Sequence, residues 1–212
     1  MVFEIVSPRE IEERSMATIT AELNGRTWPE PEFSVVKRCI HTSADFDYAD
    51  NLVFGNDAAN KGVEIFRNGC VVVTDTKMAA AGINKNALGR HDCEVKCFIS
   101  DPDVIEEAKA RGCTRATVCM EKAARETRPV IFDIGNAPTA LIEIDNLIRT
   151  NKIRPAMIIG VPVGFVNVVE SKELIIETCE EYGIPYIVAK GRKGGSNIAA
   201  TICNALLYTM GR

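Results

Sequence analysis

Short apolar runs alternate with longer amphipathic stretches from about residue 70 to the end of the chain. The apolar runs end in glycine, aspartate, serine or proline and cover residues 70–76, 94–100, 128–136, 154–162 and 184–191. Apolar residues at helical spacing mark the stretches at residues 101–112, 139–152, 171–183 and 196–210. Apolar strands that alternate with helices are typical of a mainly parallel sheet covered on both faces. The pattern therefore predicts an α/β fold, a three-layer αβα sandwich.

The first part of the chain has a different pattern, which predicts a helical extension ahead of the sheet. Ser7, Pro8 and Glu10 are spaced as in a capping box with proline in the first turn, and we expect this helix to reach about Leu23. A connection rich in proline and glycine follows. Residues 33–41 then have apolar side chains at helical spacing, which predicts a second helix.

Length and composition predict one soluble domain. Nothing in the composition divides the 212 residues, so we expect a single domain over residues 1–212, with an N-terminal helical part at 1–55 and an α/β core at 56–212. A chain of this length buries roughly 70% of the surface that it exposes when unfolded. The hydrophobic fraction of 46% and the charged fraction of 25% are those of an ordinary globular protein.

Charge and hydropathy exclude several classes of partner. The formal net charge of −4 provides no basic surface for a phosphate backbone, so we expect no nucleic-acid partner. No apolar run reaches the roughly 18 residues that a membrane span needs. The N-terminus lacks the basic start and apolar centre of a signal peptide, so we expect a cytoplasmic protein.

The eight cysteines do not form a metal motif. They are scattered, no CxxC pair occurs, and the tightest spacing is Cys93 to Cys97. Only two histidines are available to complete a zinc site. We therefore expect reduced, buried cysteines that pack as small hydrophobic side chains, and no metal bound by the protein itself.

The predicted strands lead into loops suited to an anionic ligand. In open α/β sheets, ligands bind beyond the carboxyl ends of the strands. The loops at these ends combine small residues with helix starts and lie at residues 74–82, 133–141, 160–165 and 190–197. In the second of these, Asn136 and Pro138 either cap a helix or form a wall of the pocket. The third has no titratable group, so its role is steric.

The glycine-rich segment at residues 191–196 has two interpretations. It lacks the spacing of a Walker A loop, and no G-x-G-x-x-G follows any strand. Its glycines either relieve backbone strain in an ordinary turn, or Gly194, Gly195 and Ser196 bind anionic groups of a ligand. The two basic side chains within the segment favour the second interpretation.

His41 is the main candidate for proton transfer. It ends an apolar-patterned helix, one turn after Arg38, and Asp45 and Asp47 follow it. A lone histidine is often structural, but imidazole is the side chain best suited to proton transfer near neutral pH. A nearby carboxylate would raise its pKa and keep a proton available. No nucleophile motif such as G-x-S-x-G accompanies it, which argues against a hydrolase triad.

Several motifs together resemble the precorrin-8X and cobalt-precorrin-8 methylmutases of cobalamin synthesis. They are "RS" at Arg14 and Ser15, "IHTSADFDYADNLVF" at residues 40–54, "GNAPTAL" at 135–141, "GVPVGFVNVVESKE" at 160–173 and "GRKGGSNIAATICNAL" at 191–206. The resemblance covers essentially the whole chain in order. The acidic form of the segment after His41 is more similar to the cobalt-precorrin branch.

The resemblance implies an isomerase that moves a methyl group from carbon 11 to carbon 12 of the corrinoid ring. It implies a 1,5-sigmatropic shift, assisted by His41 through a proton or hydrogen bond to a ring nitrogen, which gives cobyrinic or hydrogenobyrinic acid. No cofactor is implied, since any cobalt belongs to the substrate. The family pattern also implies a homodimer.

Substrate contacts also follow from the resemblance. The residues that match the family's contacts are Arg14, Ser15, Arg38 and Arg115. Asn84 stands where the precorrin branch often has threonine, which keeps a polar side chain for a substrate contact. Two other functions fit parts of the sequence: a non-catalytic corrinoid carrier on the same fold, and a nucleotide-dependent enzyme that uses residues 191–196 for phosphate.

Overall fold

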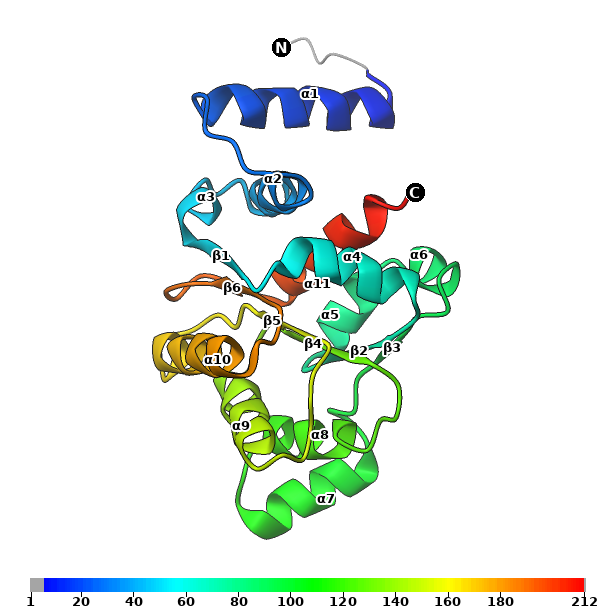
Figure 1. The fold of residues 1–212 in the computed structure, drawn as a ribbon, viewed down its shortest axis with the longest axis vertical. Coiled ribbons are helices and arrows are strands. Elements are labelled where there is room, and N and C mark those ends of the chain that lie inside the picture. Colours follow the sequence, from blue (N-terminus) through cyan, green and yellow to red (C-terminus); the bar gives the residue numbers. More distant parts are fainter. Residues whose placement is uncertain (1–5, 212) are drawn as a thin grey trace.

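A six-stranded sheet of order β1-β6-β5-β4-β2-β3 organises residues 6–211, the part of the chain that the computed structural model describes (Figure 1). The strands are β1 (Leu52–Gly55), β2 (Val71–Thr74), β3 (Glu94–Lys96), β4 (Val130–Ile134), β5 (Met157–Gly160) and β6 (Tyr186–Ala189). Neighbouring strands pair in parallel, except that β1 is antiparallel to β6. The predicted mainly parallel α/β sheet is confirmed.

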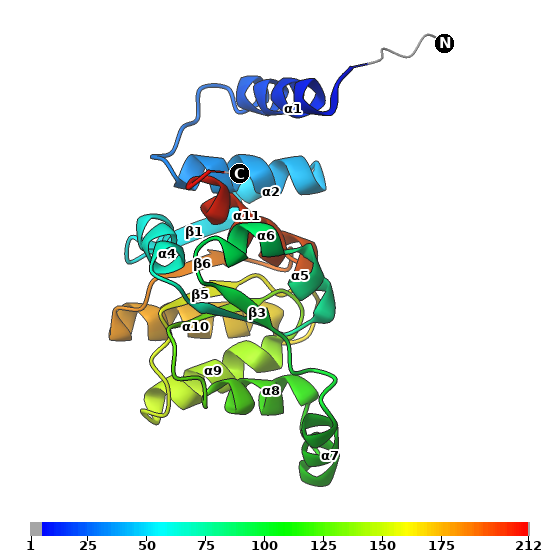
Figure 2. The same cartoon turned by 90° about the vertical axis from the view of Figure 1, so that its right-hand side faces the viewer.

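Helices cover both faces of this sheet, as predicted (Figure 2). They are α1 (Pro8–Glu22), α2 (Glu32–Ser43), α3 (Tyr48–Asn51), α4 (Ala58–Arg67), α5 (Lys77–Gly82), α6 (Lys85–Gly89), α7 (Pro102–Arg111), α8 (Arg115–Ala123), α9 (Pro138–Arg149), α10 (Val168–Tyr182) and α11 (Ser196–Tyr208). One face packs against α4, α5 and α11, and the other against α8, α9 and α10. Outside the first layer, α2 lies on α11 and α1 lies on α2.

Strand alternation produces the two cores. Side chains of successive residues point to opposite faces, so Val72 and Ile131 join the core beneath α11, whereas Val73 and Phe132 join the core above α9. All four are at most 1% exposed. No helix within the described residues is long and apolar enough to cross a membrane.

The N-terminal extension forms as its pattern predicts. The Ser7 hydroxyl accepts a hydrogen bond from the Glu10 backbone N–H at 3.3 Å, which caps α1. In α2 the apolar face is fully buried, with Val36 and Ile40 at most 1% exposed. The helix ends at Ser43, and the next residue, Ala44, has a φ of 54° that turns the chain out of the helix. This end carries His41.

The N-terminal part is not helical throughout. Residues 52–55, which we assigned to it, form the edge strand β1, and Leu52 pairs with Ala189 of β6. Four residues are too few for a clear period-two pattern, and their burial is set by a partner far along the chain. The helical extension therefore ends before the sheet begins, and β1 joins the two parts.

Candidate active site

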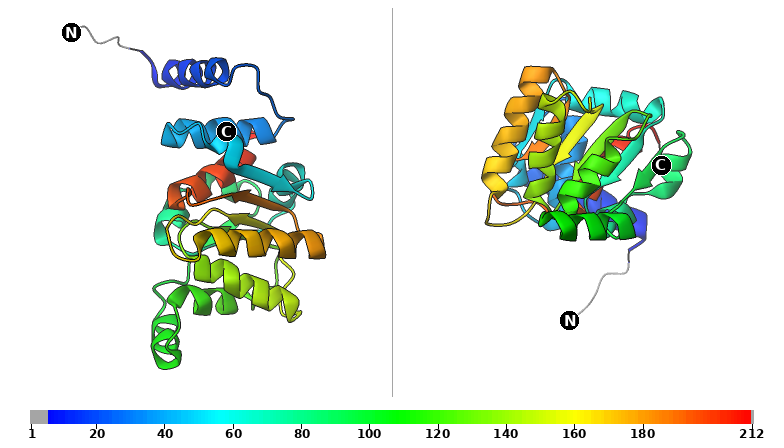
Figure 3. Two further views of the ribbon diagram at one scale, coloured as in Figure 1. Left: turned by 90° about the vertical axis from the view of Figure 1, so that its left-hand side faces the viewer. Right: turned by 90° about the horizontal axis from the view of Figure 1, so that it is seen from below.

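The carboxyl ends of the parallel strands meet at one edge of the sheet. In the left view of Figure 3, the end of α2 and the start of α10 lie on this same side of the molecule. The loops there touch closely: a Cβ on Gly194 would lie 2.1 Å from the Val161 carbonyl oxygen, and one on Gly135 would lie 2.7 Å from the Ser196 Cα. Glycine is needed at both positions because the backbones are in direct contact.

His41 is held by a residue of the first helix. The Ser15 hydroxyl lies 2.7 Å from His41 Nδ1, which joins α1 to the last turn of α2. The His41 side chain is exposed, and its Nε2 has no hydrogen-bond partner within residues 6–211. The bond to Nδ1 orients the ring and leaves Nε2 available to a ligand. Sequence matching assigned Ser15 to the substrate, whereas the structure places it against the imidazole.

The carboxylates after His41 do not serve the histidine. Asp45 and Asp47 both accept hydrogen bonds from Lys193 Nζ, each at 2.6 Å. The bond from Lys193 lowers the pKa of the Asp45 carboxyl, and the two carboxylates raise the pKa of Lys193. The prediction that these aspartates act on His41 is therefore not supported by the geometry. They instead tie the turn after α2 to the glycine-rich loop, and Lys193 is not free for a ligand.

A buried lysine anchors the same loop from the other side. Lys172 of α10 is 1% exposed, and its Nζ donates to the carbonyl oxygens of Gly191 at 2.9 Å and Lys193 at 2.8 Å. Burial lowers the pKa of Lys172 to about 8, while the two carbonyl acceptors favour the ammonium form. Sequence reasoning missed this residue, because a lysine in an amphipathic helix normally indicates the solvent face.

Arg14 and Arg38 lie near His41 but already have partners. Arg14 Nη2 is 2.6 Å from Glu10 Oε1, one turn earlier in α1. Arg38 Nη2 donates to Glu12 Oε1 at 3.2 Å, and its guanidinium lies 4.9 Å from the Tyr208 ring centroid. Both arginines lie on the helices that hold His41, and their assignment to the substrate stays a prediction.

Three other predicted contacts are occupied by the protein itself. Asn84 caps α6 by accepting from the Ala87 N–H at 3.0 Å, and its amide donates to Tyr208 Oη at 3.2 Å. The N–H of Gly195 donates to the Val161 carbonyl at 2.9 Å. Both Gly195 and Ser196 are buried. The Asn84 side chain and the Gly195 N–H therefore make contacts within the fold.

Ser196 joins the glycine-rich loop to the loop after β2. Its hydroxyl lies 2.7 Å from the Thr76 hydroxyl. Gly194 packs on the Val161 carbonyl, as described above, and is partly exposed. These contacts connect the segment at residues 191–196 to the loops after β2 and β5, which is compatible with the turn interpretation of its glycines, and its binding of anionic groups stays a prediction.

Arg115 lines a cavity of about 550 Å³ at the same edge. The cavity is bounded by the starts of α5 and α8 and by the turn before α9. Lys77 also lines it, is exposed, and has no carboxylate partner within the described residues. None of Arg14, Ser15, Arg38, His41 and Asn84 lines this cavity. Arg115 and His41 thus belong to different parts of the edge, on opposite sides of the sheet.

The turn before α9 supplies no free N–H groups to this cavity. The Asp75 carboxylate accepts from the backbone N–H groups of Gly135 at 3.0 Å, Asn136 at 2.8 Å and Ala137 at 2.6 Å. Burial raises the pKa of Asp75, and these three bonds act in the opposite direction. The N–H groups of Gly135, Asn136 and Ala137 are therefore engaged within the fold, whereas the cationic side chains of Arg115 and Lys77 line the cavity and can attract an anion.

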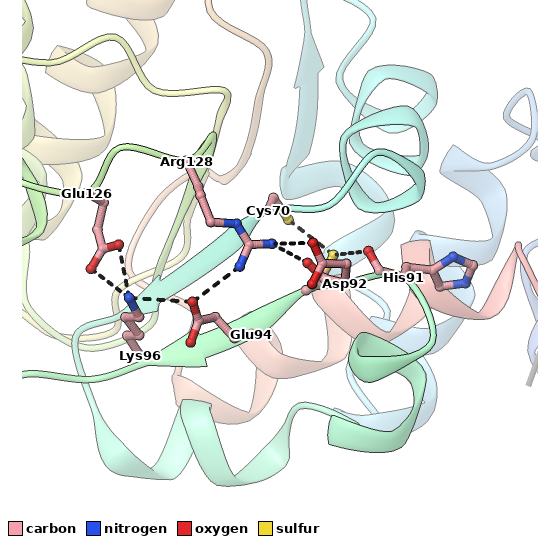
Figure 4. Close-up of polar contacts among 8 residues, drawn as sticks. Cys70, His91, Asp92, Glu94, Lys96, Glu126 and Arg128 are labelled. Atoms are coloured by element: carbon pink, nitrogen blue, oxygen red, sulfur yellow. Dashed lines mark hydrogen bonds and ion pairs between the residues drawn. The ribbon is translucent and has the colours of Figure 1, made fainter.

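The second histidine lies in a different cluster, shown in Figure 4. Cys70 and Cys93 sit side by side there, with their sulfur atoms 3.6 Å apart, and the His91 carbonyl accepts a bond from Cys93. These residues precede β2 and β3, so they lie at the amino ends of the strands, away from His41. All eight cysteines are free thiols. Within residues 6–211, no three His, Cys, Asp or Glu side chains gather to hold a metal ion.

Comparison with known proteins shows which family the chain is similar to. A family model described as precorrin-8X methylmutase matches residues 10–209. The chain is 45% identical to the cobalt-precorrin-8 methylmutase of Leptospira interrogans, over 94% of this chain and 92% of that protein. It is 43% identical to the cobalt-precorrin-8 methylmutase of Priestia megaterium, over 95% of this chain and 88% of that protein.

A solved structure has the same fold. The crystal structure of a precorrin-8X methylmutase from Thermus thermophilus superposes with a TM-score of 0.84 at 35% sequence identity. The match covers 94% of both chains.

Proposed function

The chain belongs to the precorrin-8X methylmutase family, and on that premise we propose that it moves a methyl group from carbon 11 to carbon 12 of cobalt-precorrin-8. Methylmutases are isomerases, so the reaction rearranges one substrate. The product is cobyrinic acid, or hydrogenobyrinic acid where the ring lacks cobalt. The observation that carries this proposal is the oriented imidazole of His41, with Nδ1 on Ser15 and Nε2 open.

His41 assists the methyl shift as a proton or hydrogen-bond donor. In a 1,5-sigmatropic shift the methyl group crosses one face of the conjugated ring, and no external methyl donor or covalent nucleophile is required. A donor at a ring nitrogen withdraws electron density from the conjugated system and lowers the barrier. With Nδ1 engaged by Ser15, Nε2 is the atom of His41 that faces the substrate. The chain needs no cofactor for this step.

The substrate carries acetate and propionate groups around its ring, and the site offers cations for them. Arg115 and Lys77 line the cavity at the strand ends. Arg14 and Arg38 border His41, and each would exchange its carboxylate partner, Glu10 or Glu12, for a substrate carboxylate. Arginine binds carboxylates through paired hydrogen bonds, which suits several scattered acids. We assign the substrate to the cobalt form, because the relatives at 43% and 45% identity are named cobalt-precorrin-8 methylmutases.

We also propose that the chain acts as a cytoplasmic homodimer. His41 and Arg115 line different parts of the edge, on opposite sides of the sheet, so a second copy would bring further groups to each part. The outer helix α1 packs mainly on α2, and its Ile11 is 52% exposed. Light scattering of the purified protein tests this assembly: twice the mass of one chain is expected, and a single-chain mass contradicts it.

Turnover tests the proposed function. The purified chain is incubated with precorrin-8X and with cobalt-precorrin-8 in separate reactions, and the absorption spectrum of each is followed. We expect the spectrum of the conjugated ring to change faster with the cobalt form. His91→Asn is the matched control, because this histidine lies at the other edge of the sheet and should leave turnover unchanged. Binding without any spectral change would indicate a carrier instead of an enzyme.

A further inference from the structure

The loop between β5 and α10 exposes a group of apolar side chains. Val163 is 46% exposed, Phe165 84% and Val166 76%, and all three lie within four consecutive residues. Single exposed apolar residues are common on protein surfaces, whereas contiguous patches mark sites of interaction. The patch lies at the carboxyl edge of the sheet, where the candidate site is.

A cation accompanies this patch. The guanidinium of Arg192 lies 5.6 Å from the centroid of the Phe165 ring. The backbones are also joined, because the Gly164 N–H donates to the Arg192 carbonyl at 3.3 Å. Gly164 has a φ of 149°, which favours glycine at this point of the loop. The surface therefore combines an apolar face with a positive rim, and Arg192 has no carboxylate partner within the described residues.

The patch is tied to the turn that carries the catalytic candidate. Arg192 is followed by Lys193, whose ammonium holds Asp45 and Asp47 at 2.6 Å, a few residues after His41. Lys172 stabilises the same loop by donating hydrogen bonds to two of its carbonyl oxygens. The loop that follows β6 thus connects the apolar patch to the turn after His41, at one edge of the fold.

We propose that Val163, Phe165 and Val166, with Arg192 at their rim, form the surface on which the tetrapyrrole macrocycle packs. The inference rests on the proposed function. A macrocycle of this type has a broad apolar ring with ionised carboxylates around it, which matches an apolar face bordered by a cation. Phe165 supplies the largest apolar area, and Arg192 pairs with one peripheral carboxylate.

Binding of cobyrinic acid tests this surface without requiring turnover. Its Kd is measured by absorption titration for the intact protein, for Phe165→Ala and for Arg192→Gln. Ile142→Ala is the matched control, because Ile142 is a 38% exposed apolar residue on α9. We expect Phe165→Ala to raise the Kd at least tenfold and Arg192→Gln to raise it with a weaker salt dependence. The control should bind as the intact protein does.

The outcomes separate the inference from the proposed function. If the intact protein turns over cobalt-precorrin-8 but Phe165→Ala binds cobyrinic acid normally, the surface assignment is wrong and the function stands. If no substrate is turned over but Phe165→Ala still loses binding, the surface stands and the function is wrong. If Phe165→Ala instead changes the molecular mass in light scattering, the loop is a contact between copies and the inference is overturned.

Discussion

Asp133 provides a sharp test of the electrostatic reasoning. It lies in the central strand β4, paired with Thr74 on one side and Ile159 on the other, and it is 0% exposed. Neither carboxyl oxygen has a hydrogen-bond partner within the described residues. Burial, with a contribution from the charge of Asp75, raises the pKa of Asp133 well above its ordinary value, against a smaller opposing contribution from the neighbouring Cys203 thiol.

The sign of the resulting pH dependence follows from linkage. Above about pH 3.9, where an unfolded aspartate ionises, the folded state binds more protons than the unfolded state. The contribution of Asp133 to the free energy of unfolding therefore falls as pH rises, by about 1.4 kcal/mol per pH unit, until its folded-state pKa is reached. Asparagine has nearly the same shape and does not titrate. Asp133→Asn should remove this slope.

Urea unfolding of the intact protein and of Asp133→Asn at pH 5, 6 and 7 measures the effect. At pH values below the folded-state pKa of Asp133, the free energy of unfolding of the variant should rise relative to that of the intact protein. The expected rise is about 1.4 kcal/mol for each unit of increasing pH. Asp92→Asn is the control, because it removes a carboxyl whose side chain is 95% exposed and not buried. Parallel stability curves for Asp133→Asn and the intact protein would refute the assignment of a buried, protonated carboxyl.

Two further predictions concern the residues that hold His41 in place. Ser15→Ala should lower kcat roughly two- to tenfold, the value of about one neutral hydrogen bond, with little change in Kd for cobyrinic acid. Single-turnover spectra measure this change in rate, and an unchanged kcat means that Ser15 does not orient the His41 ring. Lys193→Met should shift the midpoint of urea unfolding only slightly, because the ion pairs are partly exposed, while kcat falls. Urea unfolding and kinetics test it together; a large loss of stability with normal kcat contradicts the positioning role.

Local patterns were sufficient to predict most of the fold. The apolar runs predicted the five parallel strands, and the Ser7 cap predicted the start of α1, because both depend on residues close together in the sequence. The edge strand at residues 52–55 was missed, since its pairing with β6 is decided by residues far along the chain. Periodicity carries no information on such contacts.

The candidate site was predicted less completely, for the same reason. The histidine could be chosen from the sequence because it is rare, but its bond to Ser15 joins residues 26 positions apart. The pairing of Lys193 with Asp45 joins residues 148 positions apart, and it changed the expected role of both side chains. The burial of Lys172 could not be predicted from the sequence either, since its carbonyl partners lie in a loop that is distant in sequence.

The role of His41 as a proton or hydrogen-bond donor in the methyl shift is the central claim, and substitution of this residue tests it most directly. Methyl migration on cobalt-precorrin-8 is measured for the intact protein, His41→Ala and His41→Asn, with His91→Asn as the control. If His41 donates a proton, both His41 variants should bind cobyrinic acid normally and lose about 10²- to 10⁴-fold in kcat. If His41→Asn retains normal kcat, a hydrogen bond is sufficient and proton transfer is excluded. If both variants retain normal kcat with the fold intact, His41 is a structural residue and the central claim is wrong.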